Sequence, residues 1–401
     1  MNVIVIGGGA AGFFSAINAA ENNPKADVCI LEKSNKLLQK VLVSGGGRCN
    51  VTHACFENGL LIKNYPRGEK ELRSAFSKFT TTDTIEWFKK RDVILKTEAD
   101  GRMFPITDNS ETIANCLLAA AEKTNIEIKL QVAVKEIMPD KNGFVLKTDK
   151  EDLYCDKLII ATGGNPKAES YSWLKKLGHT IIPPVPSLFT FNIADRELHK
   201  LMGLSVPNAK VKVVNTKLQT EGPLLITHWG LSGPAVLKNS AWGACILNEL
   251  NYDFTIQVDW LNKFKEDDLR EELLFQKENL APKLVVNTNP FELPKRLWEY
   301  FLLKAEFSEN IRWADVTKKQ INALVNILMR NEYAVKGKTT FKEEFVTCGG
   351  VSLKEVDFAT MQSKIVPNIF FAGEVLDIDG ITGGFNFQSA WTTGWIAGGA
   401  M

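Results

Sequence analysis

The chain opens with a β-strand signal that runs into a glycine turn and then into a helix. Four β-forming residues lead into Gly7-x-Gly9-x-x-Gly12, and the apolar run 13–20 follows without a break. Gly7 permits the tight turn, Gly9 lets a phosphate approach the backbone, and Gly12 lets the helix pack against the strand. The amino terminus of that helix attracts negative charge. The first twelve residues therefore predict a pyrophosphate site in a βαβ unit.

An acidic residue stands where such a unit needs one. Residues 28–31 are expected to form the second strand, which ends at Glu32, 20 residues beyond Gly12. A carboxylate about 20 residues after the last glycine binds a ribose hydroxyl in dinucleotide sites. The alternative, a glycine-rich turn that binds nothing, leaves the three glycines and Glu32 unexplained.

Composition restricts the partners. The chain has 401 residues, enough for two or three domains. Its 48 basic and 47 acidic residues give a net charge of +1, so charge gives no reason to expect nucleic acid or an anionic membrane. Seven scattered cysteines fit reduced thiols, and no apolar run reaches the ~18 residues of a membrane span. We expect a cytoplasmic protein with a small-molecule substrate; its oligomeric state is left open.

The pattern along the chain predicts a discontinuous first domain. Residues 1–187 alternate β and α signals, and this alternation resumes at 342–401. Between them, shorter strands with polar turns over 188–259 and 334–341 indicate a β domain. Residues 260–333 read as helical, with a capping box at Thr317-Lys-Lys-Gln320. We therefore predict an α/β chain whose first domain is built from both ends.

Two further glycine-rich motifs indicate where a cofactor would extend. Ser44-Gly-Gly-Gly-Arg-Cys-Asn50 exposes backbone amides beside the cationic fork of Arg48 but lacks the Lys-Ser/Thr of an ATP-binding loop. Phe371-Ala-Gly-Glu374 and the stretch 382–390 precede a helix expected from about Asn386. The amino terminus of such a helix would stabilise the anionic reduced form of a flavin.

Other reactive side chains give weaker signals. The four histidines do not cluster, so a metal site is not expected, and His228 is the one weak candidate for a proton donor. Cys49 and Cys55 are spaced Cys-x5-Cys rather than the Cys-x4-Cys of flavin disulfide reductases, which disfavours a dithiol mechanism. The catalytic acid or base is otherwise unassigned.

Taken together, these motifs resemble a family of bacterial FAD-dependent oxidoreductases that includes aminoacetone-oxidase-like and bile-acid-reductase-like flavoproteins. The similarity covers essentially the whole chain, at residues 7–12, 32–33, 44–50, 101–105, 161–164, 227–234, 347–351 and 372–388. It implies a Rossmann-like FAD domain with an inserted β-barrel-like domain that carries a helical subdomain. His53 departs from the family pattern, in which Asn follows Thr52.

The resemblance also implies which residues would bind FAD. The amino-terminal glycines would surround the pyrophosphate, Glu32 would hold the adenosine ribose, and the backbone of Val134 would meet the adenine. The carboxyl-terminal residues would lie beside the ribityl chain and the isoalloxazine. The full expected set is Gly7, Gly9, Ala11, Gly12, Glu32, Lys33, Gly47, Arg48, Cys49, Asn50, Val134, Thr162, Gly163, Gly373, Glu374, Gly384, Phe385, Asn386 and Gln388.

Several functions stay open at this point. The leading hypothesis is an FAD-dependent oxidoreductase in which hydride moves through flavin N5 between a small organic substrate or NAD(P)H and a second acceptor, with NAD(P)H as a transient donor. One alternative is an amine or amino-acid oxidase that uses O2. A non-catalytic flavin-binding redox sensor is another. An RNA-modifying flavoprotein is disfavoured because the chain shows no basic excess.

Overall fold

The computed structural model describes residues 1–340 and 346–401. The chain divides into two compact units. The first is Met1–Ser187 together with the carboxyl-terminal segment, and the second is Leu188–Thr340. The boundary expected at 341/342 lies outside the described residues.

A seven-stranded sheet forms the centre of the first unit, in the order β19-β20-β21-β10-β1-β2-β6. The five neighbouring strands from β21 to β6 in this order are parallel. Strands β20 and β19 extend the sheet beyond β21 with antiparallel pairing. The last parallel strand, β21, comes from the far end of the chain and pairs with β10. The strands are β1 (Asn2–Ile6), β2 (Asp27–Glu32), β6 (Glu127–Leu130), β10 (Lys157–Ile160), β19 (Val356–Asp357), β20 (Gln362–Ser363) and β21 (Ile369–Phe371).

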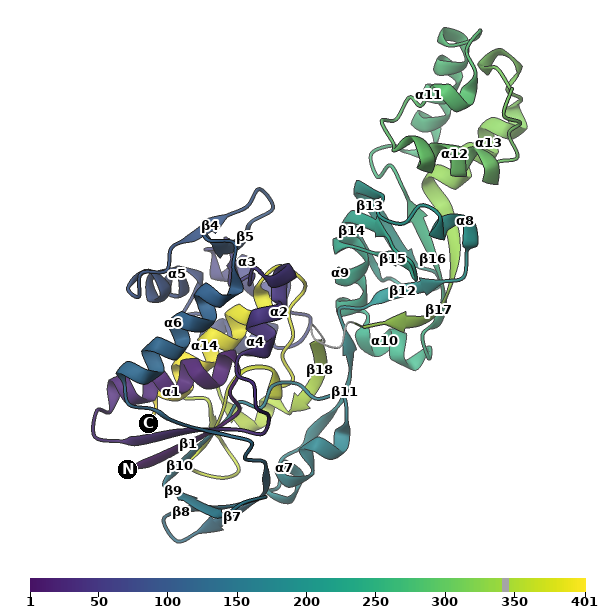
Figure 1. The fold of residues 1–401 in the computed structure, drawn as a ribbon. Helices are drawn as coiled ribbons and strands as arrows, with labels where there is room; N and C mark the ends of the chain where they lie inside the picture. Colours follow the sequence, from purple (N-terminus) through teal and green to yellow (C-terminus); the bar gives the residue numbers. More distant parts are fainter. Residues whose placement is uncertain (341–345) are drawn as a thin grey trace. The chain divides into compact units, whose positions relative to one another are not determined.

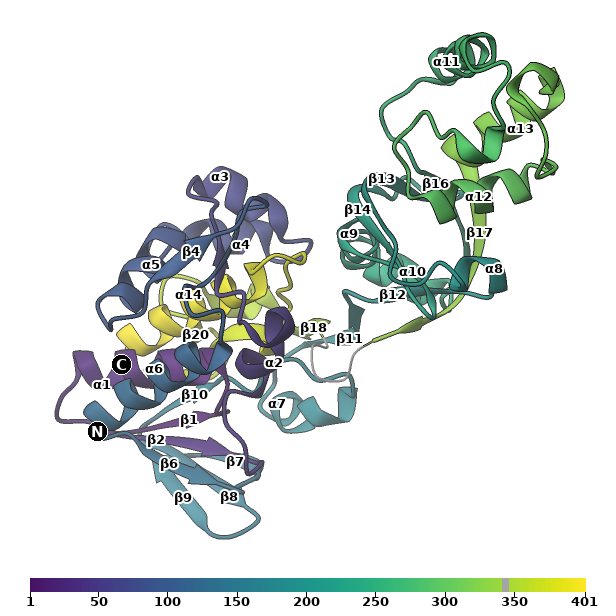
Figure 2. The ribbon, with the colours of Figure 1, turned by 45° about the horizontal axis from the view of Figure 1, so that its top comes forward.

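Three helices cover one face of this sheet, and a β-meander lies on the other (Figures 1 and 2). The helices are α1 (Ala10–Asn22), α6 (Ser110–Lys123) and α14 (Phe385–Gly399); the meander is β7 (Val134–Asp140), β8 (Gly143–Thr148) and β9 (Asp152–Cys155). The first and last helices pack side by side because glycines remove side chains between them. A Cβ at Gly398 would lie 2.3 Å from the carbonyl oxygen of Ser15. The predicted Rossmann-like domain built from both chain ends is confirmed.

Smaller elements complete the first unit. The helix α2 (Gln39–Gly47) is followed by a three-stranded sheet of β3 (Thr52–His53), β4 (Leu95–Thr97) and β5 (Arg102–Pro105). The pair β11 (Ile181–Ser187) and β18 (Val346–Val351) is antiparallel. The remaining elements are α3 (Asn58–Leu61), η1 (Ile62–Asn64), α4 (Glu69–Ala75), α5 (Thr81–Lys89), η2 (Ala168–Tyr171), α7 (Ser172–Lys176), η5 (Leu353–Glu355) and η6 (Gly373–Val375).

The second unit contains a closed barrel in the order β12-β15-β14-β13-β16-β17. The barrel strands are β12 (Thr190–Ile193), β13 (Ser205–Val213), β14 (Gln219–Ile226), β15 (Gly230–Ser232), β16 (Asp253–Asp259) and β17 (Asn331–Thr339). The short helices α8 (Arg196–His199), α9 (Pro234–Trp242) and α10 (Ala244–Glu249) belong to the same part of the chain. Strand β17 starts at Asn331, three residues before the expected return to β structure at 334. The β-barrel-like domain is confirmed.

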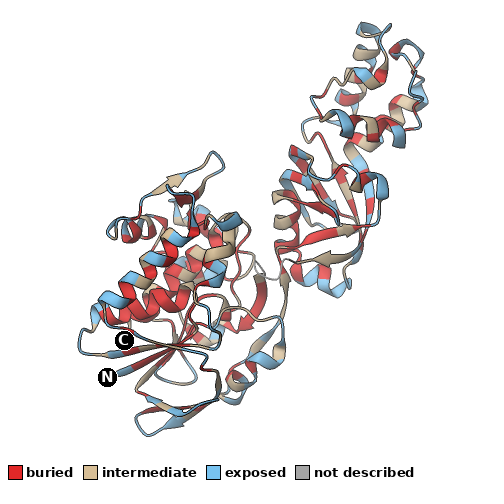
Figure 3. Ribbon diagram, viewed as in Figure 1, coloured by how far each residue is buried: buried red, intermediate tan, exposed pale blue. Residues whose placement is uncertain are grey.

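Helices inserted between β16 and β17 complete this unit. They are α11 (Glu266–Asn279), α12 (Lys295–Lys304) and α13 (Lys318–Arg330), with the short turns η3 (Val285–Asn287) and η4 (Trp313–Asp315). The capping box expected at Thr317 and Gln320 is present. Buried residues fill the barrel and the faces between the helices (Figure 3). Within residues 1–340 and 346–401, no helix is both long and apolar enough to cross a membrane.

Candidate functional site

The amino-terminal glycines lie in two kinds of environment. A Cβ at Gly7 would lie 2.3 Å from the carbonyl oxygen of Ala161, and one at Gly12 would lie 1.8 Å from that of Gly7. These two glycines therefore allow the turn and the close packing of α1. Gly9 differs, because a Cβ there would meet nothing within 4 Å. It stands at the amino terminus of α1, which no side chain caps. This open, uncapped helix end favours an anion.

The Glu32 carboxylate is fixed at the end of β2. Its two oxygens accept hydrogen bonds from the amides of Gly8, at 2.9 Å, and Ser34, at 2.8 Å. The amide of Val132 donates to the carbonyl of Glu32 at 3.0 Å, which brings the segment leading to Val134 beside it. Lys33 is exposed next in the chain. The carboxylate, the glycine turn and the start of β7 thus lie close together.

The end of β10 adds to the same edge. The Cα of Thr162 would lie 3.1 Å from a Cβ on Gly7, so Thr162 is next to the turn. Gly163 has φ +71° and open space where a Cβ would be. Strand carboxyl ends line the ligand crevice in doubly wound sheets. Thr162, and Gly163 after it, therefore lie beside the glycine turn of residues 7–12.

The carboxyl-terminal motif at Gly373-Glu374 contacts the start of α1 directly. A Cβ at Gly373 would lie 2.8 Å from the Cβ of Ala11, and Gly373 has φ +74°. The Glu374 carboxylate next to it accepts from the amide of Thr347 at 2.8 Å and pairs with Lys40 at 2.6 Å. Glu374 thus links α2 to β18. Sequence reasoning did not find Lys40 or Thr347 as its partners, because Lys40 belongs to no motif and the motif that begins at Thr347 gives no sign of its contact with Glu374.

A second group joins the Ser44–Asn50 motif to the amino terminus of α14. With its amide oriented to satisfy both ends, Asn50 accepts from the amide of Gly384 and donates to the carbonyl of Thr52, each at 3.0 Å. Phe385 stacks on His53 with ring centroids 4.6 Å apart. The His53 Nδ1 lies 2.9 Å from the carbonyl oxygen of Gly383. The histidine that departs from the family pattern therefore holds the glycine loop before α14.

Two predicted residues use their side chains inside the protein. Asn386 exchanges hydrogen bonds of 2.8 and 2.9 Å with the amide and carbonyl of Gly380. Gln388 is fully buried; its amide oxygen accepts from Thr52 at 2.6 Å and from Thr84 at 3.0 Å. Both side chains therefore shape the loop and anchor α14. Their placement beside a flavin stays a prediction.

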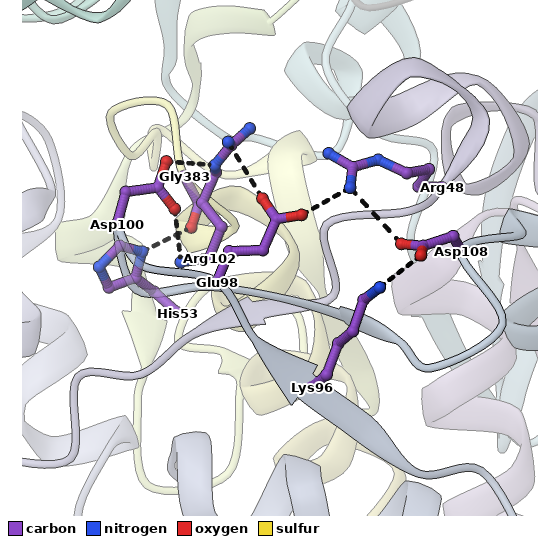
Figure 4. A network of polar contacts seen from close by, with 8 residues as sticks. All are labelled: Arg48, His53, Lys96, Glu98, Asp100, Arg102, Asp108 and Gly383. Carbon is purple, nitrogen blue, oxygen red and sulfur yellow. Dashed lines mark hydrogen bonds and ion pairs between the residues drawn. The ribbon is translucent and has the colours of Figure 1, made fainter. Parts of the chain in front are cut away.

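Arg48 lies in a chain of charged residues that Figure 4 shows. Its Nη1 is 2.6 Å from Glu98 and 3.5 Å from Asp108, and its guanidinium packs 4.0 Å from the ring centre of Phe104. Glu98 also binds Arg102, at 3.2 Å. These contacts tie the end of α2 to the β4–β5 hairpin. The neighbouring Gly46 and Gly47 have open space where a Cβ would be.

The Cys49 thiol is poorly suited to redox exchange. It is fully buried at a positive φ of 58°, and burial raises the pKa of Cys49 to about 12. Burial also raises the pKa of Cys55. A dithiol mechanism needs a thiolate, so this environment disfavours it.

Sequence reasoning missed a clamp on the loop before α14. Arg67 forms a buried ion pair with Asp379, and Ser187 Oγ donates to the same carboxylate at 2.7 Å. The amide of Ile381 donates to the carbonyl of Asn64 at 2.9 Å. Tyr65 Oη donates to the carbonyl of Phe385 at 2.7 Å. The one available signal was Asp379 directly before the glycine-rich stretch.

His228 stands in the other unit, exposed in the turn between β14 and β15. Across the described parts of the chain, no group of three or more His, Cys, Asp or Glu side chains is arranged to hold a metal.

These features fit a dinucleotide cofactor with a large second group besides the adenosine. Open space faces Gly9, Gly46, Gly47 and Gly163. Two helix amino termini, of α1 and α14, lack side-chain caps. The fixed Glu32 carboxylate can accept ribose hydroxyls. The residues present therefore suit a dinucleotide cofactor such as FAD.

Comparison with known proteins points the same way. A family model described as the HI0933-like protein Rossmann domain matches residues 1–400. The ribosomal RNA dihydrouridine synthase of Escherichia coli strain K12 is 32% identical over 409 residues, which cover 98% of this chain and 96% of that protein. The 3-dehydro-bile acid delta(4,6)-reductase of Clostridium scindens is 26% identical over 402 residues, covering 98% and 97%.

Among solved structures, a 3-ketosteroid-delta4-(5alpha)-dehydrogenase from Rhodococcus jostii RHA1 matches with a TM-score of 0.52 and 13% identity. The match covers 99% of this chain and 96% of that one. At this level of identity the likeness concerns the fold.

Proposed function

The chain belongs to the HI0933-like family, and we propose that it is an FAD-dependent oxidoreductase that reduces a carbon–carbon double bond conjugated to a carbonyl group. The main support for a dinucleotide cofactor is the environment of Gly9. This glycine leaves open space at the uncapped amino terminus of α1, beside the hydrogen-bonded carboxylate of Glu32. The relatives' names supply the reaction. Dihydrouridine is uridine with its ring double bond saturated, and a 3-dehydro delta(4,6) bile acid carries double bonds next to a ketone.

We propose uridine in ribosomal RNA as the substrate, because the relative at 32% identity covers nearly the whole chain. The expectation that nucleic acid is no partner rested on net charge alone. The reaction adds one hydride and one proton across the double bond, and NAD(P)H is the proposed source of the electrons. Bound FAD would supply the hydride from its N5 position. The seven scattered cysteines would suit the reducing cytoplasm, where ribosomal RNA is found.

The chain's own residues would hold the cofactor and manage charge. The amides at the start of α1 would bind the pyrophosphate, and Glu32 would accept from the adenosine ribose. The amino terminus of α14, held by Asn50 and His53, would stabilise negative charge on the reduced cofactor. His228 is the proposed proton donor, as an exposed imidazole in the second unit.

The test uses the purified FAD-loaded protein. Mixed anaerobically with NADH or NADPH, it should lose its flavin absorbance, and with ribosomal RNA present it should form dihydrouridine, measured by mass spectrometry of the nucleosides. His228→Gln should lower the rate of dihydrouridine formation at least about tenfold and leave flavin reduction unchanged. Hydrogen peroxide production from amines, without flavin reduction by either nicotinamide, would favour the oxidase alternative instead.

A further inference from the structure

The β14–β15 turn presents a tryptophan to solvent from a fixed backbone. Trp229 is 55% exposed. Its amide donates to Thr227 Oγ1 at 3.2 Å, and its carbonyl accepts from the amide of Ile193 at 2.8 Å. A Cβ at the next residue, Gly230, would lie 2.3 Å from the carbonyl oxygen of Phe191, so the chain after the turn packs directly on β12. The ring is therefore exposed although its main chain is held on both sides.

One exposed arginine belongs to the helix that follows β12, the strand bonded to this turn, and a second arginine contacts the end of that helix. Ile193 ends β12, and α8 begins at Arg196 three residues later, at one end of the barrel (Figure 1). Arg196 is exposed and, within the described ranges, forms no ion pair. Arg296 of α12 is also exposed; its Nη2 donates to the carbonyl of Lys200, which fixes it over the end of α8.

The acidic residue of α8 and the acidic residue that caps it are already paired. Glu197 binds Lys200 at 2.7 Å, and Asp195 binds Lys304 at 2.9 Å. Asp195 and Glu197 are therefore engaged by lysines rather than by Arg196 or Arg296. A neutral whole-chain charge thus conceals a local basic site beside an exposed aromatic ring.

We propose that this surface, made of Trp229, Arg196 and Arg296, binds single-stranded RNA. The indole of Trp229 stacks on an unpaired base, and the two guanidinium groups contact the flanking phosphates. The inference rests on the proposed function, since it deepens the substrate class from uridine to uridine in an unpaired segment. Aromatic stacking accepts any base face and needs little net charge, whereas arginine binds phosphate with several donors.

Duplex RNA fits these features poorly. Its bases are stacked within the helix, so the Trp229 ring has no base face to cover. A single strand exposes both its base faces and its phosphates. The structure therefore assigns the surface to an unpaired segment.

The binding experiment uses the full-length FAD-loaded protein and a fluorescein-labelled oligouridylate, followed by anisotropy. Trp229→Ala should weaken binding about 5- to 150-fold, the range for losing one base–aromatic stack. Trp229→Phe should recover most of this loss. Arg196→Gln and Arg296→Gln should each lower the slope of log Kd against log salt by about 0.7. A duplex RNA of the same length should bind more weakly.

Two matched controls lie on the same unit. Trp242 is 41% exposed and ends α9. The next residue, Gly243, lies against Leu218, which precedes β14, whereas Trp229 follows the other end of that strand. Lys217 is exposed in the β13–β14 turn. Trp242→Ala and Lys217→Gln should leave oligouridylate binding within about twofold of the wild-type value.

The possible outcomes test the RNA-binding surface and the proposed reaction separately. Equal losses for Trp229→Ala and Trp242→Ala would overturn the RNA surface, even if the wild type forms dihydrouridine. Displacement of the oligouridylate by a 3-oxo bile acid would also overturn it, since the ring would then bind a steroid. Binding that depends on Trp229, without any dihydrouridine formed, would support the surface and reject the proposed reaction.

Discussion

At the scale of single residues, the glycines of the first turn separate folding from cofactor binding. Gly9 has a φ of −96° and open space around its missing Cβ, so Gly9→Ala should cost the fold less than about 1 kcal/mol. The added methyl would occupy the space that a pyrophosphate needs. We expect FAD affinity to fall at least about tenfold, about 1.4 kcal/mol, in a titration of protein fluorescence.

The comparison residue is Gly12. A Cβ there would lie 1.8 Å from the carbonyl oxygen of Gly7, so Gly12→Ala must move the backbone. It should destabilise the apoprotein by about 1–3 kcal/mol in thermal or urea unfolding. If Gly9→Ala unfolds the apoprotein as much as Gly12→Ala does, the distinction between the two glycines is wrong.

A buried histidine makes the stability of the first unit depend on pH. His179 Nδ1 lies 3.3 Å from Glu355 and its Nε2 lies 3.2 Å from Ser363 Oγ. Burial lowers the pKa of His179 below its ordinary 6.5, although Glu355 favours the charged form. Below about pH 6.5 the His179 imidazole therefore binds a proton more readily in the unfolded chain than in the folded protein. The free energy of unfolding falls as the pH drops through this value.

The expected loss is at most about 1.4 kcal/mol per pH unit below 6.5. Urea unfolding between about pH 8 and about pH 5.5 measures it, above the range in which Glu355 itself titrates. His179→Gln should flatten this dependence, whereas His228→Gln, at an exposed position, should keep it. An unchanged slope in His179→Gln would show that other groups control it.

At the scale of elements, α14 depends on its close contact with α1. A Cβ at Gly398 would lie 2.3 Å from the carbonyl oxygen of Ser15, but one at Gly399 would meet only the flexible end of Asn18, at 3.3 Å. Gly398→Ala should therefore cost about 1–3 kcal/mol, and Gly399→Ala clearly less.

Because α1 carries Gly9 and α14 carries the loop at Gly384, separating the helices should also weaken FAD binding. Calorimetric melts with and without FAD test both effects of Gly398→Ala. Equal destabilisation by Gly398→Ala and Gly399→Ala would argue against the close helix contact.

The sequence predicted elements well where local chemistry determines them. The glycine turn, the capping box at Thr317 and the discontinuous first domain follow from spacing and periodicity. The apolar pattern over 127–134 by itself predicts a single strand, but the structure divides these residues between β6 and β7, which belong to different sheets. The break is at Gln131, which has a φ of +57° without any glycine or proline to signal it.

The site shows the same limit. Motif residues such as Gly7, Glu32 and Asn50 could be predicted, because each has a local reason for its residue type. The Arg67–Asp379 pair and the Lys40–Glu374 pair join residues more than 300 positions apart in the chain. Such contacts depend on how the chain ends pair in the sheet, which no local pattern encodes.

At the scale of the whole molecule, the second unit has the properties of an independent domain. Residues 188–340 form a closed barrel, which has no free sheet edge, and its core consists of residues from this unit alone. Its 153 residues, counted from 188 to 340, suffice for a stable domain. The isolated fragment should therefore unfold cooperatively in urea, with coincident far-ultraviolet and tryptophan signals.

The same fragment should bind no FAD, because every glycine of the proposed cofactor site belongs to the first unit. Equilibrium dialysis against FAD measures this directly. A non-cooperative transition with strong binding of a hydrophobic dye would show that the barrel needs the rest of the chain to fold. Cooperative folding without FAD binding would instead mean that a self-sufficient barrel is inserted in the chain between β11 and β18. Substitutions on the barrel could then change the substrate while leaving the cofactor site intact.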